Sequence, residues 1–260
     1  MNHKRLQVVF LHTWYHFKHS METWVDLLWN PMLQIWVYAL IALSFSKTAD
    51  ERGLFVIVGM IFWNIIWIAQ YSITVGALWE IWARSFSSMF ISPLTMEEFI
   101  VGQMISGTIK SILTVGVSAI IGYLLYHFSI FSLGWIMVIY YLELLVFSWA
   151  IGVLVLSLIF RYSTQVQSLS WAIVFLVQPF GAVFYPVTIL PPSVRWISYG
   201  LPVTYVFETM RGQLRHGTID WYSLVIGGAL SVIWFIVGWM IFQFTYKQAK
   251  RTGAFARLEG

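Results

Sequence analysis

The chain has 260 residues, of which 59% are hydrophobic and only 10% charged, whereas soluble domains contain about 45–50% and about 25%. This small number of charged side chains cannot form a normal water-facing surface. The composition therefore excludes a conventional soluble enzyme and indicates a protein that folds in lipid. Cysteine is absent and the net charge of +4 is scattered between apolar runs, which excludes disulfides and thiolate metal sites and makes nucleic-acid binding improbable.

Residues 1–24 predict an amphipathic helix that lies along the cytoplasmic lipid surface. Apolar residues recur at three- and four-residue steps from Leu6 to Trp24, while Lys4 and Lys18 fall elsewhere on the helix. Three imidazoles also share one side of this helix, as zinc ligands would: His12, His16 and His19. Because no fourth ligand is evident, an ordinary polar helix face is the preferred interpretation.

Apolar stretches predict six membrane spans, since a span needs roughly 20 such residues to cross about 30 Å of hydrocarbon. Charged residues bound the first two, and turn residues divide the middle of the chain. The predicted spans are 27–46, 54–79, 100–126, 131–160, 166–184 and 222–246. Six crossings put both termini on one side, and the excess of Lys and Arg there predicts that this side is cytoplasmic and that the chain is a multi-pass protein of the cell membrane.

The segment between the second and third spans is too polar to lie in lipid. Residues 80–92 predict a short cytoplasmic helix, which ends before Pro93 because proline disfavours helical geometry in the residue preceding it. Thr95 and Glu98 then fit a capping box that starts the third span. A linker that merely spaces the two spans is the alternative.

The third span carries a face of small residues, which lets membrane helices approach closely. Packing inside the subunit is the usual role of such a face, and a dimer contact or a moving seam is the alternative. Its members are Gly107, Ser111, Thr114, Ser118 and Gly122.

Lys110 and Glu143 are charges within predicted spans, where a charge costs several kcal/mol and is seldom kept without a partner or a polar pathway. Counted from the outer turn near His127, both lie at a similar depth. We expect them either to pair between the third and fourth spans or to face a central pathway. The alternative is that Lys110 extends toward the cytosol and Glu143 is simply protonated.

Residues 185–220 contain several helix-breaking residues yet stay apolar, and no full span fits: Pro186, Pro191, Pro192, Gly200 and Pro202. Two short helices near 193–199 and 202–215 are predicted, forming an external re-entrant hairpin. The second helix has an apolar side (Val203, Phe207, Met210 and Leu214) and a charged side (Glu208, Arg211 and Arg215). Glu208 and Arg211 form either a helix-surface pair or part of an exit gate.

The order of these features resembles that of the type-2 ATP-binding-cassette exporter permeases. The resemblance rests on the amphipathic start, the sequence Ile91-Ser92-Pro93-Leu94-Thr95, the run from Phe184-Tyr185-Pro186 to Ile189-Leu190-Pro191, and Gly200-Leu201-Pro202-Val203-Thr204 followed by Glu208-Thr209-Met210-Arg211. It covers nearly the whole chain, so residues 1–260 are expected to form a single all-α transmembrane domain.

The resemblance implies a dimeric membrane channel, with a homodimer expected, that rests on two ATPase subunits. Residues 80–92 would be the coupling helix, with Glu80, Arg84, Phe86, Phe90 and Pro93 at the ATPase contact. The chain has no GxxxxGK[ST] phosphate loop of its own. We therefore expect no cofactor on this chain, and ATP with Mg on the partner ATPase.

The expected substrate is an amphiphile such as a lipid-linked polysaccharide, a lipid or a drug. Aromatic residues reach 18%, and they indicate belts at the two membrane interfaces more strongly than a channel lining that stacks sugar rings. The alternative function is an ATP-independent secondary transporter or channel that uses Lys110 and Glu143, although no inverted repeat relates the two halves. An intramembrane enzyme is unlikely because no catalytic set of side chains lies within the spans.

Overall fold

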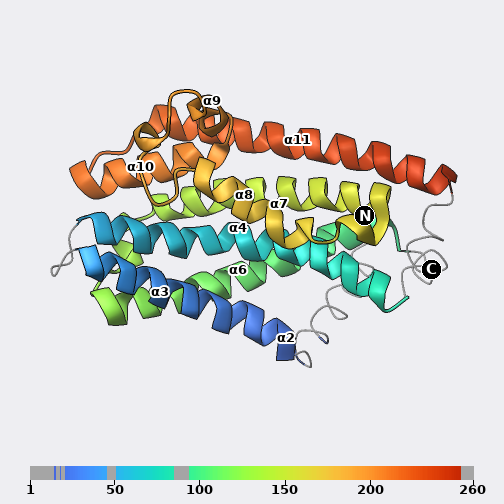
Figure 1. Ribbon diagram of the computed structural model, residues 1–260, viewed down its shortest axis with the longest axis horizontal. Helices are drawn as coiled ribbons and strands as arrows, with labels where there is room; N and C mark the ends of the chain where they lie inside the picture. Colours follow the sequence, from blue (N-terminus) through green and yellow to red (C-terminus); the bar gives the residue numbers. More distant parts are fainter. Residues whose placement is uncertain (1–14, 16–17, 19–20, 46–50, 85–93, 253–260) are drawn as a thin grey trace.

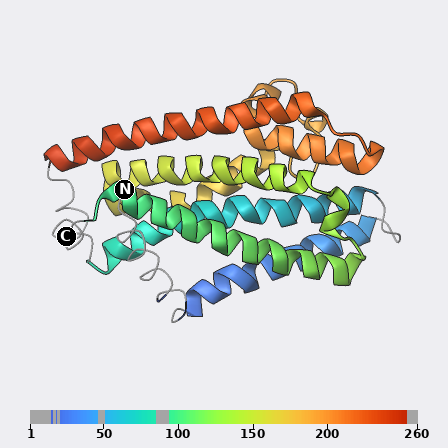
Figure 2. The same cartoon turned by 180° about the vertical axis from the view of Figure 1, so that it is seen from behind.

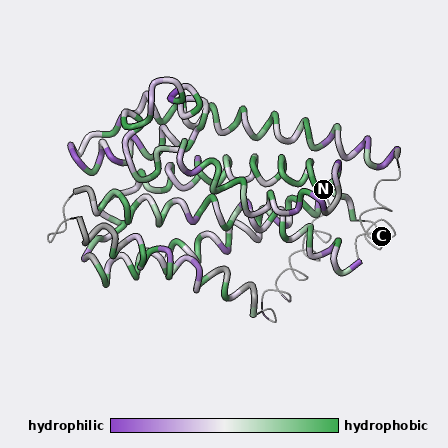
Figure 3. The backbone as a smooth tube through the Cα atoms, viewed as in Figure 1, coloured by the Kyte–Doolittle hydropathy of each residue, from purple (hydrophilic) through white to green (hydrophobic). Residues whose placement is uncertain are grey.

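The computed structural model describes residues 15, 18, 21–45, 51–84 and 94–252, and every regular element among them is a helix. The long helices lie side by side along the long axis of the molecule (Figures 1 and 2). Apolar residues follow the lengths of these helices, and hydrophilic residues gather toward their ends and on α10 (Figure 3). This distribution is the one expected of a bundle that crosses a bilayer.

Four helices among the described residues are long and apolar enough to span a membrane: Gly53–Trp82, Met96–Leu125, Ile136–Tyr162 and Trp221–Arg251. They belong to α4 (Glu51–Trp82), α6 (Met96–Tyr126), α7 (Ile136–Tyr162) and α11 (Trp221–Thr252). The second, third, fourth and sixth predicted spans are thus confirmed as long apolar helices.

The first and fifth predicted spans are shorter helices. The α3 helix covers Asn30–Phe45, and it continues without a break from α2 (Met21–Trp24) and a π-helical segment, η1 (Val25–Trp29). Pro31 explains the π-helical segment, because proline lacks the N–H that an α-helix would use there. The α8 helix covers only Leu169–Phe180, roughly 18 Å. The six-crossing topology therefore stays a prediction.

Two predicted helices lie wholly or partly outside the described residues. Nearly all of the amphipathic segment 1–24 is outside them, including the three histidines, and so are residues 85–93 of the predicted cytoplasmic helix. The described part of that helix continues α4 through Trp82, and Arg84 follows it in a turn with a φ of 55°.

The small-residue face of α6 packs against α4, as the usual interpretation predicts. Ser111, Thr114 and Ser118 are fully buried. A Cβ at Gly107 would lie 3.0–3.2 Å from Ser72 and the backbone of Ala69 on α4. The capping box is also confirmed at the start of α6, where the Glu98 N–H donates to Thr95 Oγ1 at 3.2 Å and the Thr95 N–H to Glu98 Oε2 at 3.1 Å.

The α7 helix lies at the centre, between α4 on one side and α11 on the other (Figure 1). At one end, short elements fill the connection between α8 and α11: η4 (Val187–Ile189), α9 (Arg195–Tyr199) and α10 (Pro202–His216). We call η4, α9 and α10, with the loop 181–186, the outer cap, because the topology predicted from the sequence puts this end outside. The two helices predicted near 193–199 and 202–215 are confirmed as α9 and α10, and the break between them lies at Gly200-Leu201, as predicted.

Candidate functional site

Glu143 points at α11. It lies in the second turn of α7, and its carboxylate rests against two consecutive glycines of α11, since a Cβ on Gly227 would be 2.7 Å from Oε2 and one on Gly228 3.5 Å from Oε1. Oε2 is buried and accepts no hydrogen bond. Only residues without a Cβ let the carboxyl group approach the α11 backbone so closely.

The predicted pairing of Glu143 with Lys110 is wrong for this structure. Lys110 lies at the middle of α6, whereas Glu143 is six residues, roughly 9 Å, outward from the middle of α7. The depth count was wrong because residues 127–135 form a turn and the 3-10 helix η2 (Ile130–Leu133) instead of continuing as α-helix. The two side chains also differ in direction, because it is Tyr141, not Glu143, that reaches α6, with its hydroxyl 2.7 Å from Ser111 Oγ.

Arg211 ties the outer cap together. Its Nη1 donates to the carbonyls of Ala182 at 2.7 Å and Val183 at 3.3 Å, and its Nη2 lies 3.0 Å from Glu208 Oε1. The same Glu208 oxygen accepts the Val187 N–H at 2.6 Å. The side chains of two α10 residues therefore hold the loop that joins α8 to α9.

Arg211 pairs with Glu208, as predicted, but the guanidinium does not lie on the helix surface. The residue is 5% exposed, beside the apolar Val203, Phe207 and Met210, which are buried as predicted. Its burial lowers the pKa of Arg211 from the usual value, and the Glu208 carboxylate opposes that shift. The guanidinium stays charged because an arginine pKa starts so high.

The predicted prolines of this region act at element ends. Pro186 precedes η4, and Pro202 is buried at the first position of α10, where its missing N–H costs no hydrogen bond. Pro191 is exposed in the turn before α9. Arg195 of α9 steadies this turn by donating to the carbonyls of Leu190 and Thr188.

Of the residues predicted to contact an ATPase, the structure describes two. Glu80 is half-buried in the last turn of α4, and Arg84 is exposed just beyond it. Phe86, Phe90 and Pro93 lie outside the described residues. The exposed Arg161 and Lys250 lie near the same end of the bundle, at the ends of α7 and α11 (Figure 1).

An aromatic face on α3, α4, α8 and the loop 181–186 was not predicted from the sequence. The ring centroids of Trp67 and Phe175 lie 5.1 Å apart, and the Trp67 ring also stacks with that of Tyr71. The rings of Tyr38 and Phe184 stack with their centroids 4.9 Å apart. Trp67 is at the middle of α4, where an interfacial belt does not reach. We define the aromatic face by these five residues. They come from three helices and a loop, and only Trp67 and Tyr71 share one helix, so they gave no periodic signal in the sequence.

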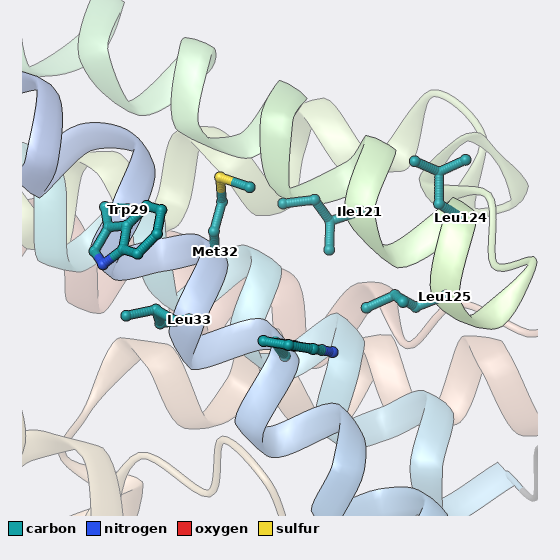
Figure 4. Close-up of a pocket in the computed structure, with 7 residues that line it drawn as sticks. Trp29, Met32, Leu33, Ile121, Leu124 and Leu125 are labelled. Atoms are coloured by element: carbon teal, nitrogen blue, oxygen red, sulfur yellow. The ribbon is translucent and has the colours of Figure 1, made fainter.

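A groove of about 310 Å³ lies between α3 and α6. Figure 4 shows its lining of apolar side chains, with Trp29, Met32 and Leu33 from the α3 side and Ile121, Leu124 and Leu125 from α6. Such a lining has almost nothing to offer a polar ligand, so the groove suits a hydrocarbon group. Within the described residues, no three His, Asp or Glu side chains gather as metal ligands would.

These features define a multi-pass membrane protein whose described elements are all helical and whose outer cap is held by Arg211 and Glu208. A model of the ABC-2 type transporter family matches residues 7–214, most of the chain, and the chain belongs to that family. It is thus the membrane component of an ATP-binding-cassette transporter, a family whose members work with an ATP-binding-cassette ATPase. A comparison with curated proteins gave no match.

Proposed function

We propose that the chain forms the translocation pathway of an ATP-driven exporter as a homodimer, with two separate ATPase subunits on its cytoplasmic side. The membership of the family carries this proposal. The absence of a phosphate loop from the sequence supports it, because ATP and Mg then have to bind to a partner chain. We further propose that both termini lie in the cytoplasm and that the membrane is the cell membrane, which the exposed basic residues Arg84, Arg161 and Lys250 near one end support.

We propose that residues 80–93 contact the ATPase. The first three of these residues form the end of α4, so a force applied to the segment acts on a helix that packs along both α6 and α7. The proposed contact is tested by co-purification of the full chain with its ATPase from cells that express both. Phe86→Ala with Phe90→Ala should lose the ATPase, and Phe131→Ala, an exposed aromatic residue in η2 near the other end, should keep it. Equal recovery of the ATPase with both variants would contradict the proposed contact.

We propose an amphiphile as the substrate, moved outward. The aromatic face supports this class because flat rings bind both sugar rings and lipid, and the apolar groove between α3 and α6 would accept a hydrocarbon chain. The external hairpin of α9 and α10 is proposed to be re-entrant and to cover the exit of the pathway. Amphiphiles of different head groups can be compared by how strongly each stimulates ATP hydrolysis by the reconstituted complex.

Trp67→Leu tests the aromatic face. It should abolish the stimulation of ATP hydrolysis by the substrate and leave the basal rate unchanged. Phe244→Leu, a 67% exposed aromatic residue of α11 outside this face, is the matched control. If both variants respond to the substrate as the wild type does, the face does not contact the substrate. Transport by vesicles that contain the chain but no nucleotide hydrolase would contradict the proposal of an ATP-driven exporter.

A further inference from the structure

The Glu143 side chain is half-buried, and one of its two carboxyl oxygens lacks a hydrogen-bond donor. Oε2 is buried without a partner and packs against Gly227 of α11. A Cβ on the same glycine would also lie 3.1 Å from the Tyr205 Cβ and 3.5 Å from the Pro202 carbonyl oxygen, at the start of α10. Glu143 therefore fills a joint between three helices, α7, α10 and α11.

Three hydroxyl groups near this joint donate elsewhere. Tyr140, one turn before Glu143 on α7, donates to Gln213 Oε1 at 2.8 Å. Tyr205 of α10 donates to a backbone carbonyl of α9 at 3.0 Å. Ser231 of α11 donates to the backbone carbonyl of Glu143 itself, at 3.1 Å, and not to its carboxylate.

The charged groups of α10 are also engaged. The Arg211 guanidinium faces Ala182, Val183 and Glu208, and the Arg215 guanidinium lies over the ring of Phe55, 5.0 Å from its centroid. Neither cation is thus directed at Glu143.

We propose that Glu143 is a proton-binding site within the membrane, and that its neutral form holds α7, α10 and α11 together beneath the outer cap. An ionised carboxylate whose Oε2 has no donor is strongly disfavoured in such a place, whereas a neutral carboxyl group of the same shape is not. Loss of the proton therefore opens the joint. This site is independent of the substrate and of the ATPase contact.

Infrared spectroscopy of the full chain in lipid nanodiscs tests the proton directly. At neutral pH the wild type should show a protonated-carboxyl carbonyl band that Glu143→Gln lacks. Glu97→Gln, which removes an exposed carboxylate at the start of α6, should keep the band. The wild-type band should also vanish reversibly at alkaline pH, a test that remains where the variant does not accumulate. A wild-type spectrum that equals that of Glu143→Gln at neutral pH would overturn the proposal.

Thiol labelling tests the joint, and the cysteine-free chain gives no background. Leu224 of α11 is 3% exposed, one turn from Gly227 and Gly228. A cysteine in its place should react severalfold faster with a water-soluble maleimide at alkaline pH, relative to a reference cysteine at the exposed Ser132. Adding Glu143→Gln should remove that rise. The same rise with Glu143→Gln, or none in the wild type, would show that the proton does not control the joint.

Discussion

Replacement of Arg211 by alanine is the most direct test of the outer cap. The change removes the donor to the Ala182 and Val183 carbonyls and the counter-charge of Glu208. Breaking a buried pair by removing one partner costs ~3–5 kcal/mol. Because the Glu208 side chain is 36% exposed and water can reach it, we expect the lower end of that range, a loss of ~3 kcal/mol in the free energy of unfolding.

Arg195→Ala is the matched control, because this residue also donates to two backbone carbonyls of the outer cap. Its side chain is only half-buried, so water replaces the lost donor and the expected cost is ~1 kcal/mol. The free energies are measured by titrating the folded chain in mild detergent micelles with a denaturing detergent. Equal losses for the two variants would refute the assignment of Arg211 as the main tie between α10 and the loop 181–186.

Three further changes give measurable effects on the same assay. Gly227→Ala places a Cβ 2.7 Å from Glu143 Oε2 and should lower the free energy of unfolding by ~1–3 kcal/mol. A loss no larger than that of Gly116→Ala would contradict the packing described. The control, Gly116→Ala, has nothing within 4 Å of the new Cβ and should be neutral or stabilise by up to ~1 kcal/mol. Asp220→Ala removes the side-chain hydrogen bonds to Ser223 at the start of α11 and should cost ~1 kcal/mol. These bonds lower the pKa of Asp220, so its contribution is present above the carboxyl pKa of the unfolded chain and is lost as the pH falls through the lower folded value; a pH-independent cost would contradict this.

Local features of the fold could be predicted from the sequence. The capping box of Thr95 and Glu98 and the small-residue face of α6 depend on residues within a few turns of one another, and both are present as expected. The break at Gly200-Leu201 follows from the backbone chemistry of glycine and of the proline after it. Features of this kind need no knowledge of how distant segments pack.

Features that join distant segments could not be predicted. The sequence predicts Arg211 as part of a charged helix face because only its neighbours on α10 are close in the chain. The carbonyls that bury it, those of Ala182 and Val183, lie 29 and 28 residues away. The depth of Glu143 depends on whether residues 127–135 rise as an α-helix or fold into a turn, and no periodicity distinguishes the two. The aromatic face takes residues from three helices and a loop, and only Trp67 and Tyr71 share one helix, so it leaves no longer repeat in the sequence.

One turn of α7 connects three parts of the molecule. Tyr140 bonds to Gln213 of α10, Tyr141 lies 2.7 Å from Ser111 of α6, and Glu143 rests on the glycines of α11. Successive residues of an α-helix point about 100° apart, which is why side chains so close in sequence reach different neighbours. This turn cannot rotate or slide toward one neighbour without loosening its contact with another. A movement of α10 in the outer cap is therefore transmitted to α6 and α11 through α7, and the proton on Glu143 would set how firmly that connection holds.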